Sequence, residues 1–368
     1  MAAAYPDCEE SEDSEDYDDS EQSRSNVTTA RSFRQARGIF EAEINCVEEV
    51  NLHKHVCCEK NPDHIGFIPP DKFTVKDLPH RYQDGDIVAL IKALAQITVL
   101  VRVKFTSPGR PDYYPNSNKP YPAAEYKGTK RLRTGSGWVW RVSIHSKSDI
   151  RQTRGKKRQR KRNSGKTCPC QDCKRSWNPR EQWAFIEIYT ATHMIFDERE
   201  GAETTCHFFY DSDDIFLDSA SVKSLRGAIR VHNEVDGDAC RMTYVTHDIR
   251  FAYDLQTKWK EYKSLHTEVG EKYNTNNNED ENAHKLTIIV SHPHGCSKQI
   301  SIGKYVKRDE MDYNNAYAKY TYTTPTCPGC SGGPVYVLSR WWWWGCDHPH
   351  GGQCEDNANL NYSGIAMY

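Results

Sequence analysis

The sequence predicts a mainly β protein that carries a helical extension at its N-terminus. Two observations support this fold class. From Thr98 onward, short runs rich in β-branched, aliphatic and aromatic residues are separated by turns that contain Gly or Pro, which is the pattern expected of strands. Before Thr98, apolar residues recur at intervals of three and four, which is typical of amphipathic helices.

The first 97 residues divide into a tail and an extension. Residues 1–26 combine acidic residues and Ser with few apolar side chains, so they are expected to be disordered because they cannot bury enough surface to offset chain entropy. Residues 27–97 are expected to form the helical extension. One helix is predicted between Arg31 and Cys58, on the spacing of Phe33, Phe40, Ile44, Val47 and Val50, and a second between Asp86 and Ile97.

Residues 98–368 are expected to form one β domain with two irregular interruptions. Residues 145–180 are basic, contain Cys and lack a strand or helix period, so they are interpreted as an insertion. The Asn-rich stretch 274–282 is interpreted as an exposed connection, with a second half of the domain from about residue 285. The predicted strands are 98–105, 135–142, 183–189, 204–210, 228–231, 241–245, 286–290, 299–305, 318–324 and 334–338.

Composition and charge narrow the class of protein. The chain of 368 residues has a formal net charge of −2 and 27% charged residues. It has neither the run of roughly 18 apolar residues that a membrane span needs nor the basic start and apolar run of a signal peptide. A cytoplasmic or nuclear location without membrane association is therefore expected, with the 14 cysteines as reduced thiols.

The stretch Thr326–Val335 is the strongest candidate for a catalytic element. It contains Gly329-x-Ser331-Gly332-Gly333-Pro334. Glycines on both sides of Ser331 allow a sharp turn that presents the hydroxyl beside backbone N–H groups able to hold a developing oxyanion. The alternative is a Gly- and Pro-rich turn between two strands, which is common in β proteins.

This loop resembles the nucleophile loop of the chymotrypsin-like (trypsin-like, two-barrel) serine peptidases. The preceding Thr326-x-Pro328-Gly329 is more similar to their glutamyl-endopeptidase-like branch than to digestive trypsins, and the strand ending on Thr190-Ala-Thr-His193 also resembles a segment of that family. The resemblance implies two perpendicular six-stranded antiparallel β-barrels with the active site between them.

The resemblance also implies a His-Asp-Ser triad. His193 would be the general base, because an imidazole with an ordinary pKa of about 6.5 can take a proton from the hydroxyl and return it to the leaving amine. Asp248, in Asp248-Ile-Arg-Phe-Ala, would orient His193, with Asp211, Asp213 and Asp254 as competitors. The order His193, Asp248, Ser331 is that of the chymotrypsin-like fold, although a histidine or aspartate at a strand end is more often structural.

Binding residues follow from the same resemblance. The backbone N–H groups of Gly329 and Ser331 would form the oxyanion hole, and the strand Asn361–Ala366 would pair with a bound peptide. Ala366 stands where glutamate-selective relatives are expected to have histidine, so the cleavage specificity is not predicted. The implied substrate-binding residues are Thr324, Thr326, Ser363 and Gly364.

Two further patterns point to ligands. Cys168, Cys170 and Cys173 place three thiolates within six residues, enough to share a structural zinc ion that Cys206, His207 or another residue would complete. The alternatives are reduced surface thiols or a local disulfide, and Cys346 and Cys354 form a second, weaker candidate. The basic run Gly155–Arg162 indicates binding to nucleic acid or to an acidic partner, which includes the chain's own acidic tail.

The functional prediction is a serine endopeptidase that hydrolyses peptide bonds through a covalent acyl-enzyme and needs no cofactor for catalysis. The first alternative is a peptidase-like module that binds polypeptides in the same cleft without cleaving them. The second is a nucleic-acid-associated protein that acts through the basic insertion.

Overall fold

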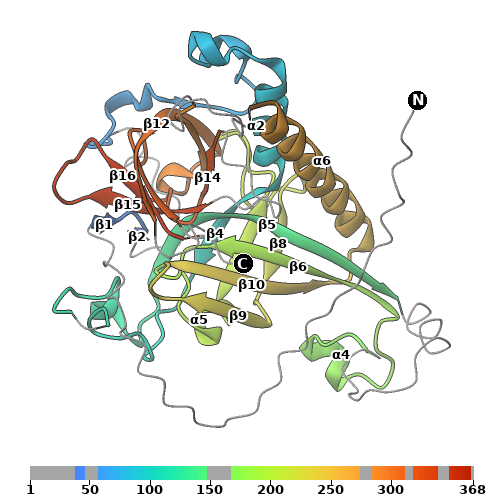
Figure 1. Ribbon diagram of the computed structural model, residues 1–368. Helices are drawn as coiled ribbons and strands as arrows, with labels where there is room; N and C mark the ends of the chain where they lie inside the picture. The colour runs from blue at the N-terminus through green and yellow to red at the C-terminus, as the bar shows by residue number, and fades with distance from the viewer. Residues whose placement is uncertain are drawn as a thin grey trace, which may run out of the picture. The chain divides into compact units, whose positions relative to one another are not determined.

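The computed structural model describes residues 38–45, 57–115, 117–146, 167–273, 284–310, 318–338 and 348–365. All of them belong to one compact unit, Arg34–Tyr368. Two antiparallel sheets form the body of this unit, and Figure 1 shows them with two long helices on one side. The mainly β fold class is confirmed.

The first sheet is an open half-barrel. Its strand order is β8-β7-β4-β5-β6-β10-β9, and β2 pairs with β5 in addition. Every pairing is antiparallel. The strands are β2 (Glu43–Asn45), β4 (Thr98–Val103), β5 (Leu132–Ser146), β6 (Gln182–Thr190), β7 (Thr204–Phe208), β8 (Lys223–Arg226), β9 (Arg230–Glu234) and β10 (Ala239–Thr246).

The second sheet closes into a six-stranded barrel. Its order is β15-β14-β11-β12-β13-β16, and pairing of β15 with β16 completes the ring; β1 and β3 attach to β15 and β12. The two-barrel fold is therefore confirmed, with the first barrel only half closed. The strands are β1 (Gly38–Phe40), β3 (Phe67–Ile68), β11 (Leu286–Ser291), β12 (Gln299–Glu310), β13 (Ala318–Tyr322), β14 (Pro334–Val337), β15 (His348–Cys354) and β16 (Asn361–Ser363).

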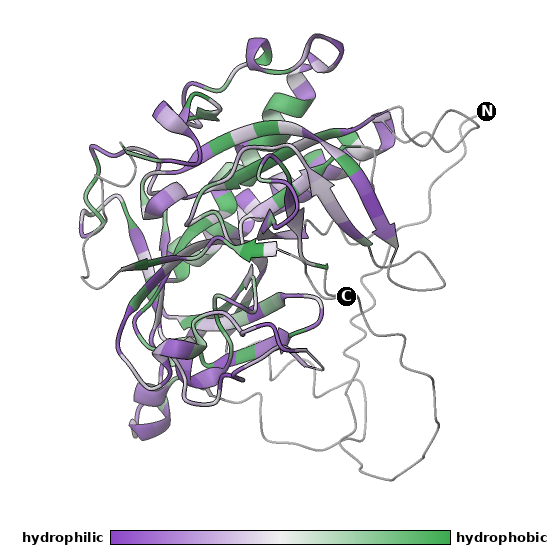
Figure 2. Ribbon diagram, turned by 90° about the vertical axis from the view of Figure 1, so that its left-hand side faces the viewer, coloured by the Kyte–Doolittle hydropathy of each residue, from purple (hydrophilic) through white to green (hydrophobic). Residues whose placement is uncertain are grey.

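The core lies between the strands and two packed helices, α2 (Gly85–Ile97) and α6 (Ile249–Tyr273). All six residues of β11 are buried and five of six in β4. Figure 2 shows apolar stretches along the strands of both sheets. The shorter helices are α4 (Gln171–Arg175), α5 (Glu198–Ala202), η1 (Pro62–His64), η2 (Val75–Asp77), η3 (His80–Tyr82), η4 (Ala124–Tyr126) and η6 (Pro293–Gly295).

The helix predicted over Asp86–Ile97 is confirmed as α2, which Asp84 caps by accepting a hydrogen bond from Asp86 N. The helix predicted between Arg31 and Cys58 is wrong over residues 38–45, where the chain forms β1 and β2. Pairing with strands of both sheets overrides the local spacing of Phe40 and Ile44. The rest of that prediction, at 31–37 and 46–56, lies outside the described residues.

Helix α6 was not predicted. Its buried residues follow a helical spacing, but they are separated by long polar stretches that dilute the apolar pattern; they are Phe251, Ala252, Leu255, Tyr262, His266, Val269 and Gly270. Within the described residues, no helix is both long and apolar enough to cross a membrane.

Candidate active site

His193 lies in the turn that follows β6, and the structure pairs it with a carboxylate. Its Nδ1 atom lies 2.8 Å from Asp238 Oδ2 and 2.9 Å from Asp238 Oδ1, and its backbone N–H donates to Oδ1 at 2.9 Å. The hydroxyl of Thr192 donates to the carbonyl of Ala239 at 2.5 Å. These contacts fix the imidazole against the turn between β9 and β10 with Nδ1 directed at the acid.

Asp238, and not Asp248, is therefore the residue that orients His193. Asp248 is exposed and caps α6, where its Oδ1 accepts a hydrogen bond from Phe251 N. Asp238 has a φ of +54° at the end of the turn Val235-Asp-Gly-Asp238, a conformation that aspartate tolerates better than most residues. The Asp-Gly turn signal immediately before strand β10 could have identified it.

Ser331 sits in the turn before β14 and is fully buried. Gly329 and Gly332 have φ values of +96° and +78°, which only glycine adopts without strain. Ser136 of β5 ties this loop to the first sheet: its N–H donates to Ser331 O at 2.8 Å and its hydroxyl donates to Gly329 O at 2.9 Å. The predicted turn around the serine is thus present and is held from both barrels.

The structure brings the serine and histidine loops together. A Cβ atom on Gly332 would lie 2.1 Å from Thr190 Oγ1 and 2.9 Å from Ala191 N, close to His193. The Ser331 hydroxyl itself is directed at Gly351 O, at 3.4 Å, and His193 Nε2 is buried without a hydrogen-bond partner among the described residues. The imidazole nitrogen that faces away from Asp238 thus has no hydrogen-bond partner among the described residues.

An extended segment of the chain's own N-terminal region occupies the space beside these residues. Strand β1 pairs with β15, and β2 pairs with β5 of the other sheet. Between them, the carbonyl oxygen of Glu41 accepts a hydrogen bond from Gly329 N at 2.6 Å. The ring of Phe40 covers His193, with 4.4 Å between ring centroids. Figure 1 shows β1 and β2 beside β15 and β16.

The side chain of Glu41 enters a polar pocket of the second barrel. It is only 3% exposed. Its Oε2 accepts a hydrogen bond from His350 Nε2 at 2.7 Å, and Lys60 Nζ contacts Oε1. Lys60 also donates to Thr326 Oγ1 at 3.0 Å and to Asn361 Oδ1 at 2.9 Å.

The ionisation of this pocket follows from its contacts. Burial alone would raise the pKa of Glu41, but the hydrogen bond from His350 and the charge of Lys60 outweigh it and lower that pKa to about 2. Burial holds the pKa of His350 below its ordinary value despite the nearby carboxylate. At neutral pH, a neutral His350 therefore donates to an ionised Glu41.

The predicted substrate-binding residues are only partly placed at this pocket. Thr326 lies beside it, because its hydroxyl accepts a hydrogen bond from Lys60 Nζ. The Thr324 hydroxyl donates to Thr287 O, and the Ser363 hydroxyl accepts from Tyr320 N, so both hold the barrel together. Gly364 packs against the turn of Asp238. The strand that pairs with the extended segment is β15, not Asn361–Ala366, and β15 supplies the pocket histidine, His350.

Two Cys and His clusters outside this group of residues each place their ligand atoms within 4.8 Å of one another. In the first, His247 Nε2 lies 3.1 Å from Cys168 Sγ, 3.8 Å from Cys170 Sγ and 3.5 Å from Cys173 Sγ. Of the three alternatives for a fourth ligand, which were Cys206, His207 and another residue, the structure brings another residue, His247, next to the three thiols. Cys206 contacts Tyr244 and His207 contacts Ser224 instead. Cys346 and Gly155–Arg162 lie outside the described residues.

The second cluster was not predicted, because its members come from distant parts of the sequence. It contains Cys58, His64, His294 and Cys327, all buried. Cys327 lies four residues before Ser331, so this cluster adjoins the candidate active site.

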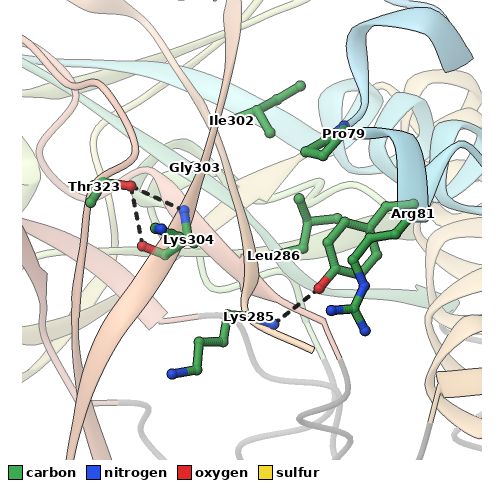
Figure 3. Close-up of a pocket in the computed structure, with 9 residues that line it drawn as sticks. Pro79, Arg81, Lys285, Leu286, Ile302, Gly303, Lys304 and Thr323 are labelled. Carbon is green, nitrogen blue, oxygen red and sulfur yellow. Dashed lines mark hydrogen bonds between the residues drawn. The ribbon is translucent and has the colours of Figure 1, made fainter. Parts of the chain in front are cut away.

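A surface pocket of about 480 Å³ lies elsewhere, between η3 and the strands β11 and β12. Figure 3 shows the Thr323 side chain hydrogen-bonded to the backbone of Lys304 on one side. On the other side, Lys285 N donates to the hydroxyl of Tyr82 at 3.3 Å. None of His193, Asp238 and Ser331 lines it. It is therefore separate from the candidate active site.

Comparisons with known proteins add the following. No family model matches the chain, and no curated protein matches it. Similar solved structures include the Rv3671c protease of M. tuberculosis in its active form, with 12% identity, a TM-score of 0.33 and coverage of 76% of this chain and 82% of that chain. Others are the protease Anisep from Arthrobacter nicotinovorans (11%, 0.35, 74% and 90%) and the thermostable serine protease AL20 from an extremophilic microorganism (10%, 0.33, 75% and 92%). Since likeness at these scores decides nothing about activity, the case for the chemistry rests on the contacts of His193, Asp238 and Ser331.

Proposed function

We propose that the protein is a serine endopeptidase in which Ser331 is the nucleophile, His193 the general base and Asp238 the residue that orients it. One observation carries this proposal. An extended peptide segment pairs with a strand of each sheet, and the carbonyl oxygen of its Glu41 accepts a hydrogen bond from the N–H group two residues before Ser331. A peptide carbonyl that accepts from a backbone N–H of the nucleophile loop makes one of the contacts that acyl transfer requires, which supports the proposal.

The chemistry follows from the three side chains. Ser331 Oγ attacks the carbonyl carbon while His193 Nε2 takes its proton, and the Asp238 carboxylate stabilises the imidazolium through Nδ1. The N–H groups of Gly329 and Ser331 hold the oxyanion, and loss of one such donor typically costs about 3 kcal/mol. His193 then protonates the leaving amine, and water releases the acyl group by the reverse steps.

We further propose cleavage after glutamate. The carboxylate next to the carbonyl at Gly329 is that of Glu41, and it is bound by His350 and Lys60 in a buried pocket. A pocket with these donors favours an ionised carboxylate over an amide or an apolar side chain, because its polar groups would otherwise be left unpaired.

The test uses a chain whose cleft is open. In Glu41→Arg, the arginine would face Lys60 and His350, so the segment is excluded and the active site is exposed. This variant should be labelled at Ser331 by a fluorophosphonate and should cleave a peptide of residues 36–45 after its glutamate. Ser331→Ala should abolish both reactions. Absence of labelling and of cleavage in the correctly folded Glu41→Arg chain would reject the peptidase and leave a binding module.

The position of the acid provides a matched comparison. Asp238→Asn should lower kcat by roughly 10⁴-fold, because an amide stabilises the wrong histidine tautomer. Asp248→Asn should leave kcat unchanged, since Asp248 only caps α6. Equal losses in the two variants would contradict the assignment of Asp238.

We also propose a structural zinc ion held by Cys168, Cys170, Cys173 and His247. Three thiolates and one imidazole form a common structural zinc set. A tetrahedral site with ordinary zinc bond lengths puts neighbouring ligand atoms roughly 3.5–3.8 Å apart, close to the separations around His247. The site lies at the end of β10 and would anchor the insertion to the first sheet.

A further inference from the structure

We infer that the protein cuts its own chain between Glu41 and Ala42 and releases residues 1–41. This inference rests on the proposed peptidase function. It concerns the chain's own segment as the substrate, and four features of the segment support it.

The first feature is register. On one side of the bond, Gly38, Ile39 and Phe40 pair with Cys354, Gln353 and Gly352 of β15. On the other side, Glu43, Ile44 and Asn45 pair with Thr134, Arg133 and Leu132 of β5. The chain thus passes from one barrel to the other at Glu41 and Ala42, and only these two residues are outside a strand.

The second feature is that Glu41 is held at both its ends. Its carbonyl oxygen is bound by Gly329 N, and its side chain is bound by His350 and Lys60. The carbon that would be attacked is therefore fixed between the nucleophile loop and the pocket. Such placement converts an encounter into an intramolecular step.

The third feature is the fit of the segment against β15 and β16. A Cβ atom on Gly352 would lie 2.0 Å from Ile39 O, and one on Gly38 would lie 2.0 Å from the Tyr362 ring. The glycines thus make room for this backbone. Phe40 adds contacts to His193, Tyr114 and Tyr362.

The fourth feature is what the cut would separate. The acidic stretch 1–26 lies before the bond, whereas Lys60 lies after it. Lys60 therefore stays with the enzyme when residues 1–41 leave, and the site that Glu41 occupied becomes available to other substrates.

The reaction balances without a further reactant except water. Ser331 Oγ forms an ester with the Glu41 carbonyl carbon, the Glu41–Ala42 bond breaks, and the amine of Ala42 takes the proton from His193. Water then hydrolyses the ester and restores the serine hydroxyl, leaving the Glu41 carboxylate on the released piece.

The test compares full-length chains after purification, by intact mass and N-terminal sequencing. The wild-type chain should begin at Ala42, whereas Ser331→Ala should remain whole. Glu41→Gln should be cut roughly 10- to 100-fold more slowly, because it loses a charge-assisted contact. Glu21→Gln, the same change elsewhere in the released piece, should be cut at the wild-type rate.

Two further measurements separate the outcomes. A first-order rate that does not change on dilution supports cutting within one chain, and a rate proportional to concentration would overturn it. A whole wild-type chain beside a Glu41→Arg variant that is labelled at Ser331 would overturn self-cleavage and leave the peptidase intact. If neither variant reacts, the peptidase proposal itself fails.

A second observation independently supports another site. We propose that Cys58, His64, His294 and Cys327 bind a structural zinc ion next to the nucleophile loop. Cys327 Sγ lies 3.5 Å from Cys58 Sγ and 3.5 Å from His64 Nε2, which matches a tetrahedral zinc site with ordinary bond lengths. The four ligands are the Cys₂His₂ set, and all are buried.

The surroundings fit thiolate ligands. Asn61 donates from Nδ2 to Cys327 Sγ at 3.2 Å and from its backbone N–H to Cys58 Sγ at 3.4 Å, as outer groups around a metal site do. His64 and His294 both lie in turns with positive φ, +48° and +52°, a strain that a bound ion would offset. Zinc here would clamp the segment that carries Lys60 onto the nucleophile loop.

Metal content tests this site separately from activity. Elemental analysis of the purified full chain should find two zinc ions, one lost in Cys170→Ser and the other lost in Cys327→Ser. His64→Gln provides a second variant of the new site should Cys327→Ser not fold. Cys354→Ser, outside both clusters, should keep two. A wild-type chain whose only zinc is lost in Cys170→Ser would overturn this second site.

Discussion

Lys60 is the charged group that faces the Glu41 carboxylate, so its replacement tests how glutamate is recognised. In Lys60→Met, the apolar stem stays and the ammonium is lost, together with its contacts to Thr326 and Asn361. We expect the preference for glutamate over glutamine to fall, whereas cleavage of a glutamine peptide should change little.

The size of the effect follows from the pocket's electrostatics. The pKa of Glu41 is lowered from 4.5 to about 2 against the opposing effect of burial, which corresponds to about 3 kcal/mol of favourable interaction with the ionised form. This value is what remains after the opposing effect of burial, and both His350 and Lys60 contribute to it. A charge-assisted hydrogen bond contributes about 1.5–3 kcal/mol, so Lys60→Met should lower the Glu/Gln ratio of kcat/KM by roughly 10- to 100-fold.

The sign of the pH dependence follows as well. Because the bound carboxyl has a pKa below that of the free one, its stabilisation is fully present above about pH 4.5 and is lost as the pH falls toward 2. The advantage of a glutamate peptide over a glutamine peptide should therefore shrink in acid, and Lys60→Met should show less of this change.

The assay compares two peptides of residues 36–45, with Glu or Gln at the position of Glu41, in the Glu41→Arg background with and without Lys60→Met. Lys76→Met is the matched control, because Lys76 is exposed on η2. If Lys60→Met lowered kcat/KM equally for both peptides, Lys60 would be a structural residue and the reasoning would be refuted.

Three further predictions concern other residues. Glu200→Gln should lower the free energy of unfolding in urea by about 3–5 kcal/mol, because the buried Arg110 and Arg133, bonded to Glu200 at 2.6 and 2.8 Å, lose their carboxylate; exposed Glu198→Gln should change it by less than about 0.5 kcal/mol. Burial alone would raise the pKa of Glu200, but these arginines lower it. The contribution of Glu200 to the free energy of unfolding is therefore present above about pH 4.5 and is lost in acid. If stability fell with acid equally in the wild type and in Glu200→Gln, this prediction would be wrong. Gly329→Ala should reduce kcat about 10²- to 10³-fold, since its Cβ would lie 2.6 Å from His292 O and displace the donor; unchanged peptide turnover would show that Gly329 N is not an oxyanion donor. Phe40→Ala should slow cutting at Glu41 in a timed in vitro translation, because the segment loses its contacts with His193 and Tyr114, and wild-type timing would show that the ring does not position the segment.

The sequence located the parts of the site that depend on local chain geometry. Gly329 and Gly332 predict a turn with positive φ values, which glycine adopts without strain. His193 follows a continuous run of strand-forming residues. The strands that carry them were predicted within a few residues because their apolar and β-branched runs are long. Strand β15 was not predicted, because Pro349 and the pair Gly351-Gly352 are residues typical of turns and not of strands.

Asp238 could not be chosen from local pattern alone. Asp248 precedes an apolar alternation that reads as a strand, but the same residues continue for 25 positions as α6, and an aspartate before a helix is a cap. A strand and a helix are told apart here by the spacing of the apolar residues. Phe251 and Leu255 are four residues apart, which fits one face of a helix and also the alternation of a strand. Asp238, by contrast, sits in a turn whose direction is set by the pairing of β9 with β10.

The segment around Glu41 shows a different limit. Phe40 and Ile44 are four residues apart, which predicts one helical face, yet Phe40 packs on His193 while Ile44 pairs with Arg133 of the other sheet. Each residue of such a segment contacts a different part of the two sheets, so its apolar residues follow neither a helical nor a strand periodicity. Glu41 of this stretch is buried against a histidine and a lysine from distant positions. Although the apolar spacing suits a helix, we interpret the stretch as a substrate and not as a structural element. The conformation of residues 38–45 is then explained by cleavage at Ser331. If the chain stays whole although Ser331 is active, this explanation of the segment is wrong.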